Sequence, residues 1–365
     1  MVNKRNTGID CLRIVAMLYI VTLHYNGFGG IMPTDSENFP LYALSGSIQM
    51  LTICAVNCFA IISGYVGYSE VKKPYRFYSY LSLWLEVAVY SFILYSISYF
   101  CGNGTTWKDC LKALFPLTTN MYWYFTAYTP LFFLIPFLND SIRYSTRQQM
   151  LTLCLILTGL FCFVSASGDA FHLHSGYSFA WLLLLYLIGA TLKKCDIVRL
   201  IPTSYAFTGI LLLWLFRTTM YLYGPNLTVF LFKLHRSQLE SYTNLSTLLL
   251  SVLHIIGFAD LRTTSPKLQS LISKIAPRTF SIYLLNTHPV VWSCLILGSF
   301  SQYVNGSLLL LLFRLISTSC VFVIVSILID VLRNKLFELF SINTLTKKIG
   351  QLGNVCIGTF FCEDE

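Results

Sequence analysis

The sequence contains few charged residues: Asp, Glu, Lys and Arg make up 11% of its 365 residues, whereas hydrophobic residues make up 55%. Soluble domains carry about 25% charged residues, so this composition argues against a soluble protein and places the chain in a lipid bilayer. The net charge of +9 does not indicate a nucleic-acid partner. The basic residues fall in short clusters between apolar runs, a pattern typical of membrane orientation.

Three common motifs are also missing. The twelve cysteines include no C-x-x-C pair and no Cys/His ligand spacing, which argues against a zinc site, and we expect no metal. No P-loop is present, which argues against an ATP-driven pump. The first apolar run lacks a small-x-small cleavage site and contains Arg13, so it is better interpreted as a retained helix than as a signal peptide.

Apolar segments long enough to cross a bilayer, about 20 residues each, recur along the chain. We predict an all-α, polytopic integral membrane protein of about ten transmembrane helices, with a transmembrane domain over 1–335 and a cytoplasmic tail over 336–365. A count of nine or eleven stays open, because one segment is short and 222–243 is ambiguous. The predicted spans lie near 9–28, 43–66, 77–100, 120–138, 149–166, 178–192, 203–222, 244–259, 279–299 and 307–332.

The distribution of basic residues predicts the orientation. With the N-terminus inside, 18 of the 25 Lys and Arg residues fall in inside segments, 4 in outside loops and 3 within spans. Inside segments of membrane proteins are enriched in Lys and Arg. We therefore expect both termini to be cytoplasmic and the protein to be a multi-pass protein of the cell membrane.

The first span carries polar side chains that are costly in lipid. Arg13 and His24 are eleven residues apart, which is about 20° past three helical turns, so both face the same direction roughly 16 Å apart along the axis. Asp10 lies one turn before Arg13 and can pair with it. A structural explanation is a snorkelling arginine plus a hydrogen-bonded histidine.

A functional explanation is a track with two stations. Arg13 near the inner face suits a phosphorylated ligand from the cytoplasm, and His24 suits a general base for a hydroxyl nucleophile. Acyl-coenzyme A has the matching shape, with phosphates at one end and a reactive carbonyl at the other.

Four blocks, in order, resemble the integral-membrane acyltransferase family 3. The family's Asp, Leu, Arg-x10-His signature appears in "IDCLRIVAMLYIVTLHY", and its F-x-x-x-S-G block in "FAIISGY", which contains Ser63 and Gly64. Its Y-W-F block resembles "MYWYFTAYTPLFFLIPFLN", with Trp123 and Tyr128, and its I-Y-L-aliphatic-His block resembles "SIYLLNTHPVVW". The last block departs from the family, because Asn286 occupies the usual histidine position.

The resemblance implies an O-acyltransferase, most simply an O-acetyltransferase. The donor would be cytoplasmic acetyl-CoA or another acyl-CoA, used as a substrate with no bound cofactor. The acceptor would be a hydroxyl of a cell-surface or capsular polysaccharide or of a lipid-linked glycan, and membrane lipids surround the protein. His24 and Arg13 are the catalytic candidates, with His24 acting as base or as transient acyl carrier.

Further residues are candidates for substrate binding, each with a structural alternative. Ser63 and Gly64 could line the donor channel or mark close helix packing, and Trp123 and Tyr128 could line the site or lie in an interfacial belt. Glu86 could pair with Arg217 or Arg314, or orient His24. The set of substrate-binding candidates is Asp10, Ser63, Gly64, Glu86, Trp123, Tyr128 and His288.

His288 follows Asn286 by two residues. Two residues rotate a helix by about 200°, so His288 can replace the family histidine only if Pro289 distorts the helix.

The competing function is a polytopic transporter or a flippase of a lipid-linked glycan, which would also need many helices and intramembrane charges. Flippases typically spread many charges through a wide cavity, whereas only a few polar groups occur in these spans. The sequence therefore favours the enzyme.

Overall fold

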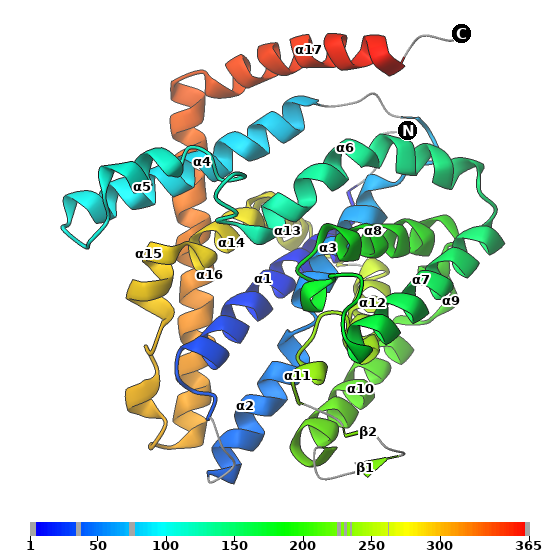
Figure 1. Ribbon diagram of the computed structural model, residues 1–365, viewed down its shortest axis with the longest axis vertical. Coiled ribbons are helices and arrows are strands. Elements are labelled where there is room, and N and C mark those ends of the chain that lie inside the picture. Colours follow the sequence, from blue (N-terminus) through cyan, green and yellow to red (C-terminus); the bar gives the residue numbers. More distant parts are fainter. Residues whose placement is uncertain are drawn as a thin grey trace.

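The computed structural model describes residues 5–33, 38–72, 77–224, 228–229, 232–233, 236–261 and 263–361, and these residues are almost entirely helical (Figure 1). The helical and strand elements in chain order are α1 (Thr7–Phe28), α2 (Phe39–Thr52), α3 (Ala55–Gly67), α4 (Phe77–Phe100), α5 (Trp107–Lys112), α6 (Trp123–Tyr144), α7 (Arg147–Ser167), η1 (His174–Gly176), α8 (Phe179–Lys194), α9 (Ile197–Leu200), α10 (Thr203–Tyr223), β1 (Thr228–Val229), β2 (Phe232–Lys233), α11 (Arg236–Leu239), α12 (Leu245–Ala259), α13 (Pro266–Ile275), η3 (Ala276–Arg278), α14 (Thr279–Thr287), α15 (Pro289–Val291), η4 (Trp292–Ile296), η5 (Ser301–Tyr303), α16 (Leu308–Leu339) and α17 (Ile342–Phe361). β1 and β2 form one short antiparallel pair.

The predicted spans correspond to helices, but the predicted number of crossings is not confirmed. Within the described residues, six helical segments are long and apolar enough to cross a membrane, and a seventh is a bent pair. The other three predicted spans fall on α6, which is interrupted by two prolines, on α8 with 16 residues and on α12 with 15 residues. The arrangement fits a polytopic membrane protein.

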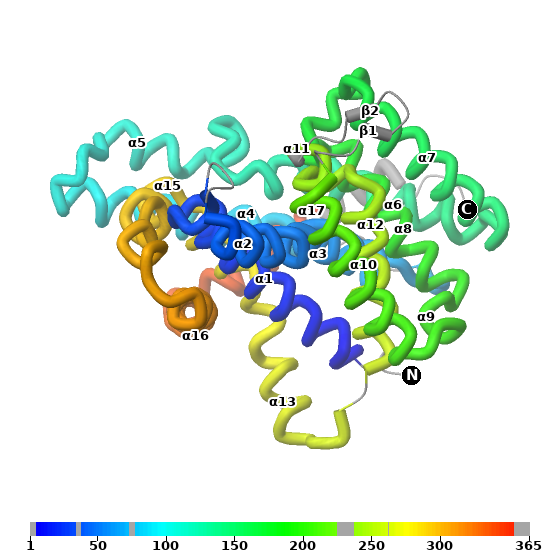
Figure 2. The backbone as a smooth tube through the Cα atoms, turned by 90° about the horizontal axis from the view of Figure 1, so that it is seen from below, coloured from blue at the N-terminus to red at the C-terminus, as the bar shows by residue number. Residues whose placement is uncertain are grey.

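Helix α1 lies in the interior of the bundle. It packs against α2, α3, α12, α14 and α16, and Figure 2 shows it between α16 on one side and α10 on the other. Asn6 caps its start, because the Asn6 side-chain oxygen accepts from the Ile9 N–H at 3.1 Å. Gly8 allows a close approach to α12: a Cβ there would lie 1.8 Å from the Phe258 carbonyl oxygen. The first turn of α1 is therefore fixed by the Asn6 cap and by its close contact with α12.

Helices α3 and α8 pack backbone to backbone. A Cβ at Gly64 would lie 2.0 Å from the Tyr186 carbonyl oxygen, and a Cβ at Gly189 would lie 2.1 Å from the Ile61 carbonyl oxygen. Small residues permit such close contacts in membranes. Gly64 thus lies at a helix–helix contact, which matches the structural alternative considered for it.

The predicted span over 279–299 is broken in its middle. Helix α14 ends at Thr287, His288 is extended at φ −66° and ψ 131°, and Pro289 opens α15. Proline disfavours helical geometry in the residue before it. The segments on either side of the break are bent by 61°, so Pro289 does distort the helix at His288.

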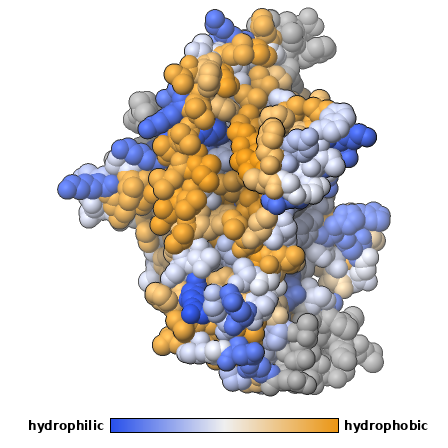
Figure 3. Space-filling view, turned by 90° about the vertical axis from the view of Figure 1, so that its left-hand side faces the viewer, coloured by the Kyte–Doolittle hydropathy of each residue, from blue (hydrophilic) through white to orange (hydrophobic). Residues whose placement is uncertain are grey.

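The exterior is strongly apolar. The face shown in Figure 3 carries broad hydrophobic areas between smaller hydrophilic ones. On α16, Phe313, Val321 and Leu328 are all more than half exposed. Water would penalise this exposure whereas lipid would not, so the surface supports a membrane environment.

Candidate active site

His24 lies on the wall of a narrow cavity of about 50 Å³. Met17, Ile20 and His24 share one face of α1, because they are spaced three and four residues apart, and all three line the cavity. The Trp292 ring packs 5.0 Å from the His24 ring between centroids. The predicted base therefore borders a narrow space instead of being packed on all sides.

The His24 ring is hydrogen-bonded to Asn286, which occupies the position where the resembled family usually has a histidine. The His24 Nδ1 and the Asn286 Oδ1 form a hydrogen bond, and Asn286 is fully buried. With the Asn286 oxygen facing it, Nδ1 of the neutral ring is the donor, because an amide oxygen only accepts hydrogen bonds. The lone pair is then on Nε2, which is the nitrogen left for a ligand in the cavity.

The remaining cavity wall is mostly aromatic. The Trp123 and Tyr177 rings lie 4.5 Å apart, and the Tyr177 and Tyr242 rings lie 5.1 Å apart, between centroids. The tyrosines add hydroxyl groups to otherwise apolar faces. The cavity is lined by Met17, Ile20, His24, Val56, Phe59, Trp123, Tyr124, Tyr177, Tyr242, Phe280, Tyr283 and Thr287. Trp123, a predicted site residue, is thus placed together with His24.

Arg13 and Asp10 are paired as their spacing predicts. The Arg13 Nη1 lies 3.4 Å from the Asp10 Oδ1, and Asp10 is buried. Arg5 forms a second, two-pronged ion pair with the same carboxylate, a contact that the sequence analysis missed because it counted Arg5 only toward orientation. Because Arg5 also neutralises Asp10, part of the donor capacity of Arg13 is left for another anion. The Arg13 side chain is 23% exposed.

Two stacked tyrosines of α6 connect the cavity to Arg13. The Tyr124 and Tyr128 rings are nearly parallel, at 7°, with centroids 6.3 Å apart. Tyr124 lines the cavity, and both tyrosines lie near Arg13. The Ser63 side chain hydrogen-bonds to Tyr124. Arg13, Ser63 and Tyr128 are not among the residues that line the His24 cavity, and Tyr124 is a lining residue that contacts both Ser63 and Tyr128.

Glu86 lies in a separate ionic cluster: it pairs with an arginine, as one of its two alternatives predicted, but with neither Arg217 nor Arg314. Glu86 pairs with Arg333 at 3.6 Å, whereas the Arg314 guanidinium lies 4.1 Å from the Tyr303 ring centroid. Asn286 holds the position beside His24. The last predicted span ends at residue 332, but α16 continues to Leu339. Arg333 therefore belongs to a helix of the bundle and contacts Glu86 from there.

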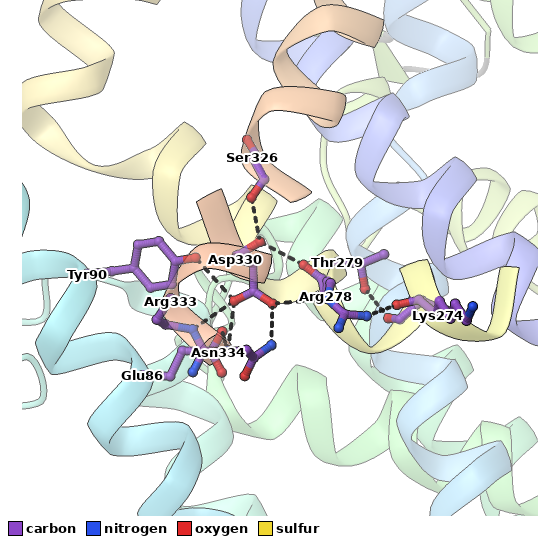
Figure 4. Close-up of polar contacts among 11 residues, drawn as sticks. Glu86, Tyr90, Lys274, Arg278, Thr279, Ser326, Asp330, Arg333 and Asn334 are labelled. Atoms are coloured by element: carbon purple, nitrogen blue, oxygen red, sulfur yellow. Dashed lines mark hydrogen bonds and ion pairs between the residues drawn. The ribbon is translucent and has the colours of Figure 1, made fainter. Parts of the chain in front are cut away.

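The cluster around Glu86 is centred on the buried Asp330 (Figure 4). Arg333 contacts the Asp330 carboxylate at 2.8 Å, Tyr90 donates to it at 3.2 Å, and the Arg278 Nε lies 3.8 Å away. These contacts join α4, η3 and α16. The observed contacts give Glu86 a structural role.

Arg217 is fully buried and has neutral partners. Its Nε donates to the Met50 carbonyl at 3.2 Å, its Nη2 donates to the Leu239 carbonyl at 2.9 Å, and its Nη1 hydrogen-bonds to Ser246. The guanidinium therefore joins α10 to α2 and to the start of α12.

His288 is buried and lies at the break between helices α14 and α15. Its ring lies 4.7 Å from the Tyr95 ring between centroids, and its Nδ1 accepts from the Val290 N–H at 3.2 Å. The residues that line the His24 cavity do not include His288. The structure therefore brings Asn286, rather than His288, to the catalytic candidate.

Cys54, Cys58 and His254 form a buried group that spacing along the chain could not reveal. Their ligand atoms all lie within 4.8 Å of one another, although His254 comes from a different helix. The Cys54 thiol also donates to the Leu51 carbonyl at 3.2 Å, and the His254 Nδ1 hydrogen-bonds to the Leu250 carbonyl at 2.8 Å. Helix packing accounts for these contacts, and the expectation of no metal stays a prediction.

A helical bundle with an apolar exterior and a histidine–amide pair at an internal cavity has the features of an integral-membrane enzyme. The family model of an acyltransferase domain matches residues 6–331. The chain therefore belongs to the acyltransferase family 3 and is an acyltransferase. No curated protein and no solved structure matches it.

Proposed function

We propose that this protein is a multi-pass O-acetyltransferase of the cell membrane. It transfers the acetyl group of cytoplasmic acetyl-CoA to a hydroxyl of a cell-surface or capsular polysaccharide, or of its lipid-linked precursor. The observation that carries the proposal is the hydrogen bond between His24 and Asn286 at the wall of the aromatic cavity.

The His24–Asn286 pair supports general base catalysis. With Nδ1 bonded to Asn286, Nε2 of His24 takes the proton of the acceptor hydroxyl as its oxygen attacks the thioester carbonyl. The tetrahedral intermediate collapses, the C–S bond breaks, and the coenzyme A thiolate recovers the proton from Nε2. The ester is formed and His24 returns to its starting state, so no covalent acyl-enzyme is required.

Donor binding follows the path of stacked tyrosines. The partly exposed Arg13 offers a planar guanidinium fork to a phosphate of coenzyme A. Tyr124 and Tyr128 then flank the pantetheine arm between Arg13 and the cavity. The continuous helix α1 sets these stations roughly 16 Å apart, so the thioester reaches His24 only when the phosphates are near Arg13.

Acceptor binding suits the aromatic wall. Sugar rings have apolar C–H faces and hydroxyl edges, and the faces and hydroxyls of Tyr177 and Tyr242 beside Trp123 offer both kinds of contact. The competing transporter or flippase of a lipid-linked glycan is not favoured, because the family match is to an acyltransferase.

Replacing Arg13 should weaken donor binding more than it slows chemistry. We expect Arg13→Ala to raise the KM for acetyl-CoA by about 10- to 100-fold, the effect of losing a hydrogen bond to a charged group, with a smaller change in kcat. Arg13→Lys should have an intermediate effect, since it keeps the charge and loses the fork. Steady-state kinetics of the purified protein measure both constants.

Arg5→Ala is the matched control, because it also removes a partner of Asp10. An equal rise in KM for Arg5→Ala and Arg13→Ala would assign Arg13 to the ion pair alone.

Donor and acceptor should approach from opposite membrane faces. In sealed vesicles of known orientation, we expect acetyl-labelled acetyl-CoA to be consumed only from the side that bears the termini, and the label to appear on glycan at the other side. Vesicles containing the His24→Ala protein provide the background. Consumption from both sides, or acetylation only of glycan on the donor side, would contradict the proposed path.

A further inference from the structure

A second cavity lies beside the His24 cavity. It is an open cavity between the last turns of α7, the loop that carries η1 and the segment leading into α12, and its volume is about 490 Å³. The charge distribution places both of these loops on the outside. Its wall includes Gly159, Ser165, Ser175, Ser241, Thr243 and Asn244.

The described lining of this cavity is uncharged and mixes polar side chains with apolar ones, among them Phe163 and Leu245. Its described lining contains serine, threonine, asparagine and glutamine side chains but no Asp, Glu, Lys, Arg or His. Ser165 and Thr243 hydroxyls lie 2.6 Å apart, and Ser241 and Thr243 hydroxyls lie 2.7 Å apart. Hydroxyls and amides both donate and accept, so this wall matches a neutral ligand rich in hydroxyl groups.

The two cavities share a thin wall. Tyr242 lines the His24 cavity, whereas its neighbours Ser241 and Thr243 line the second cavity. The η1 loop repeats this arrangement, with Tyr177 on the His24 cavity and Ser175 on the second. The two tyrosine hydroxyls lie 3.4 Å apart. The two cavities are therefore separated by little more than these short segments, so neighbouring units of one chain-like ligand can lie on either side of them.

We propose that the second cavity is a subsite for neutral sugar units that flank the acetylated unit of the acceptor chain. This inference rests on the proposed function. It makes an oligomeric or polymeric glycan, rather than a free sugar, the preferred acceptor. The aromatic cavity selects the unit to be acetylated, and the hydroxyl-rich cavity holds its neighbours.

The test fills the second cavity without touching the first. A Cβ at Gly159 meets nothing within 4 Å, so Gly159→Phe adds bulk without displacing a neighbour. Leu160→Phe is the matched control, because Leu160 is the next residue of α7, is 43% exposed and lies about 100° around the helix. The acceptors are a monosaccharide and a longer neutral fragment prepared from the same surface polysaccharide of the host.

For the wild-type protein we expect a KM at least about tenfold lower for the longer fragment, the effect of about 1.4 kcal/mol of binding free energy. Gly159→Phe should remove this preference and leave the kinetics with the monosaccharide unchanged, whereas Leu160→Phe should keep it. Thr243→Val, which removes a hydroxyl without adding bulk, should reduce the preference.

Different outcomes separate the inference from the function. Equal KM values for both acceptors in the wild type, or a preference for acidic fragments, would overturn the subsite while acetylation itself stood. A wild-type protein that acetylates neither fragment, although it is folded and binds acetyl-CoA, would overturn both.

Discussion

His24→Ala should lower the rate of acetyl transfer by about 10²- to 10⁴-fold, the usual contribution of a positioned general base. The variant lacks the imidazole that would take the proton from the acceptor hydroxyl. The KM for acetyl-CoA should change little, because the proposed donor-binding residue Arg13 lies about three turns away on α1. Radiolabel transfer from acetyl-CoA to glycan by the purified protein measures the loss. His172→Asn is a matched control, because His172 is an exposed loop histidine with φ 51°, a backbone conformation that asparagine tolerates.

Both variants should elute from size exclusion in detergent as the wild type does, since His24 is only half-buried. If the folded His24→Ala protein kept the wild-type rate, His24 would not be the general base, and another group would have to take the proton of the acceptor hydroxyl.

Asn286→Leu should lower kcat by about 10- to 100-fold, a loss typical of removing a partner that orients a functional histidine. Leucine is close in volume but accepts no hydrogen bond, so the His24 ring can rotate and lose its fixed proton on Nδ1. Asn286→Asp keeps an acceptor oxygen, and Asn286→His restores the residue that the family resemblance implies at this position. Both should recover activity relative to Asn286→Leu.

The division between kcat and KM distinguishes orientation from general damage. We expect the KM for acetyl-CoA in Asn286→Leu to stay near that of the wild type, because Arg13 and Tyr128 are unaffected. A leucine variant with full kcat would show that the hydrogen bond to His24 has no part in catalysis. A loss that neither Asp nor His recovers would point to packing at this buried position instead.

Relations along one helix could be predicted from the sequence. The common face of Arg13 and His24 and the pair between Asp10 and Arg13 depend only on helical periodicity, and the structure contains an unbroken α1 with that pair. The membrane class likewise followed from composition. Helical spacing depends only on residues close together in the chain, and composition is a sum over residues. Both can therefore be read from a single sequence.

Relations between helices could not be predicted in the same way. The contact between His24 and Asn286 joins residues 262 positions apart, and neither helical rotation nor depth is encoded in a hydropathy pattern. Glu86 was assigned to the wrong arginines for this reason, since the length of α16 decided that Arg333 would reach it. The crossings assigned to α8 and α12 stay predictions, because these helices have 16 and 15 residues, fewer than the roughly 20 that span a bilayer.

The buried Arg217 has a consequence for how the protein enters the membrane during synthesis. An arginine at the centre of an inserting helix opposes insertion by about 2.5–3.5 kcal/mol, and α10 has the lowest hydropathy, 1.2, of the six candidate spans in the described residues. Met50 of α2 is synthesised before Arg217, but Leu239 and Ser246 are synthesised after it. The hydrogen bonds of the Arg217 guanidinium are therefore complete only after the start of α12 has been synthesised and packed.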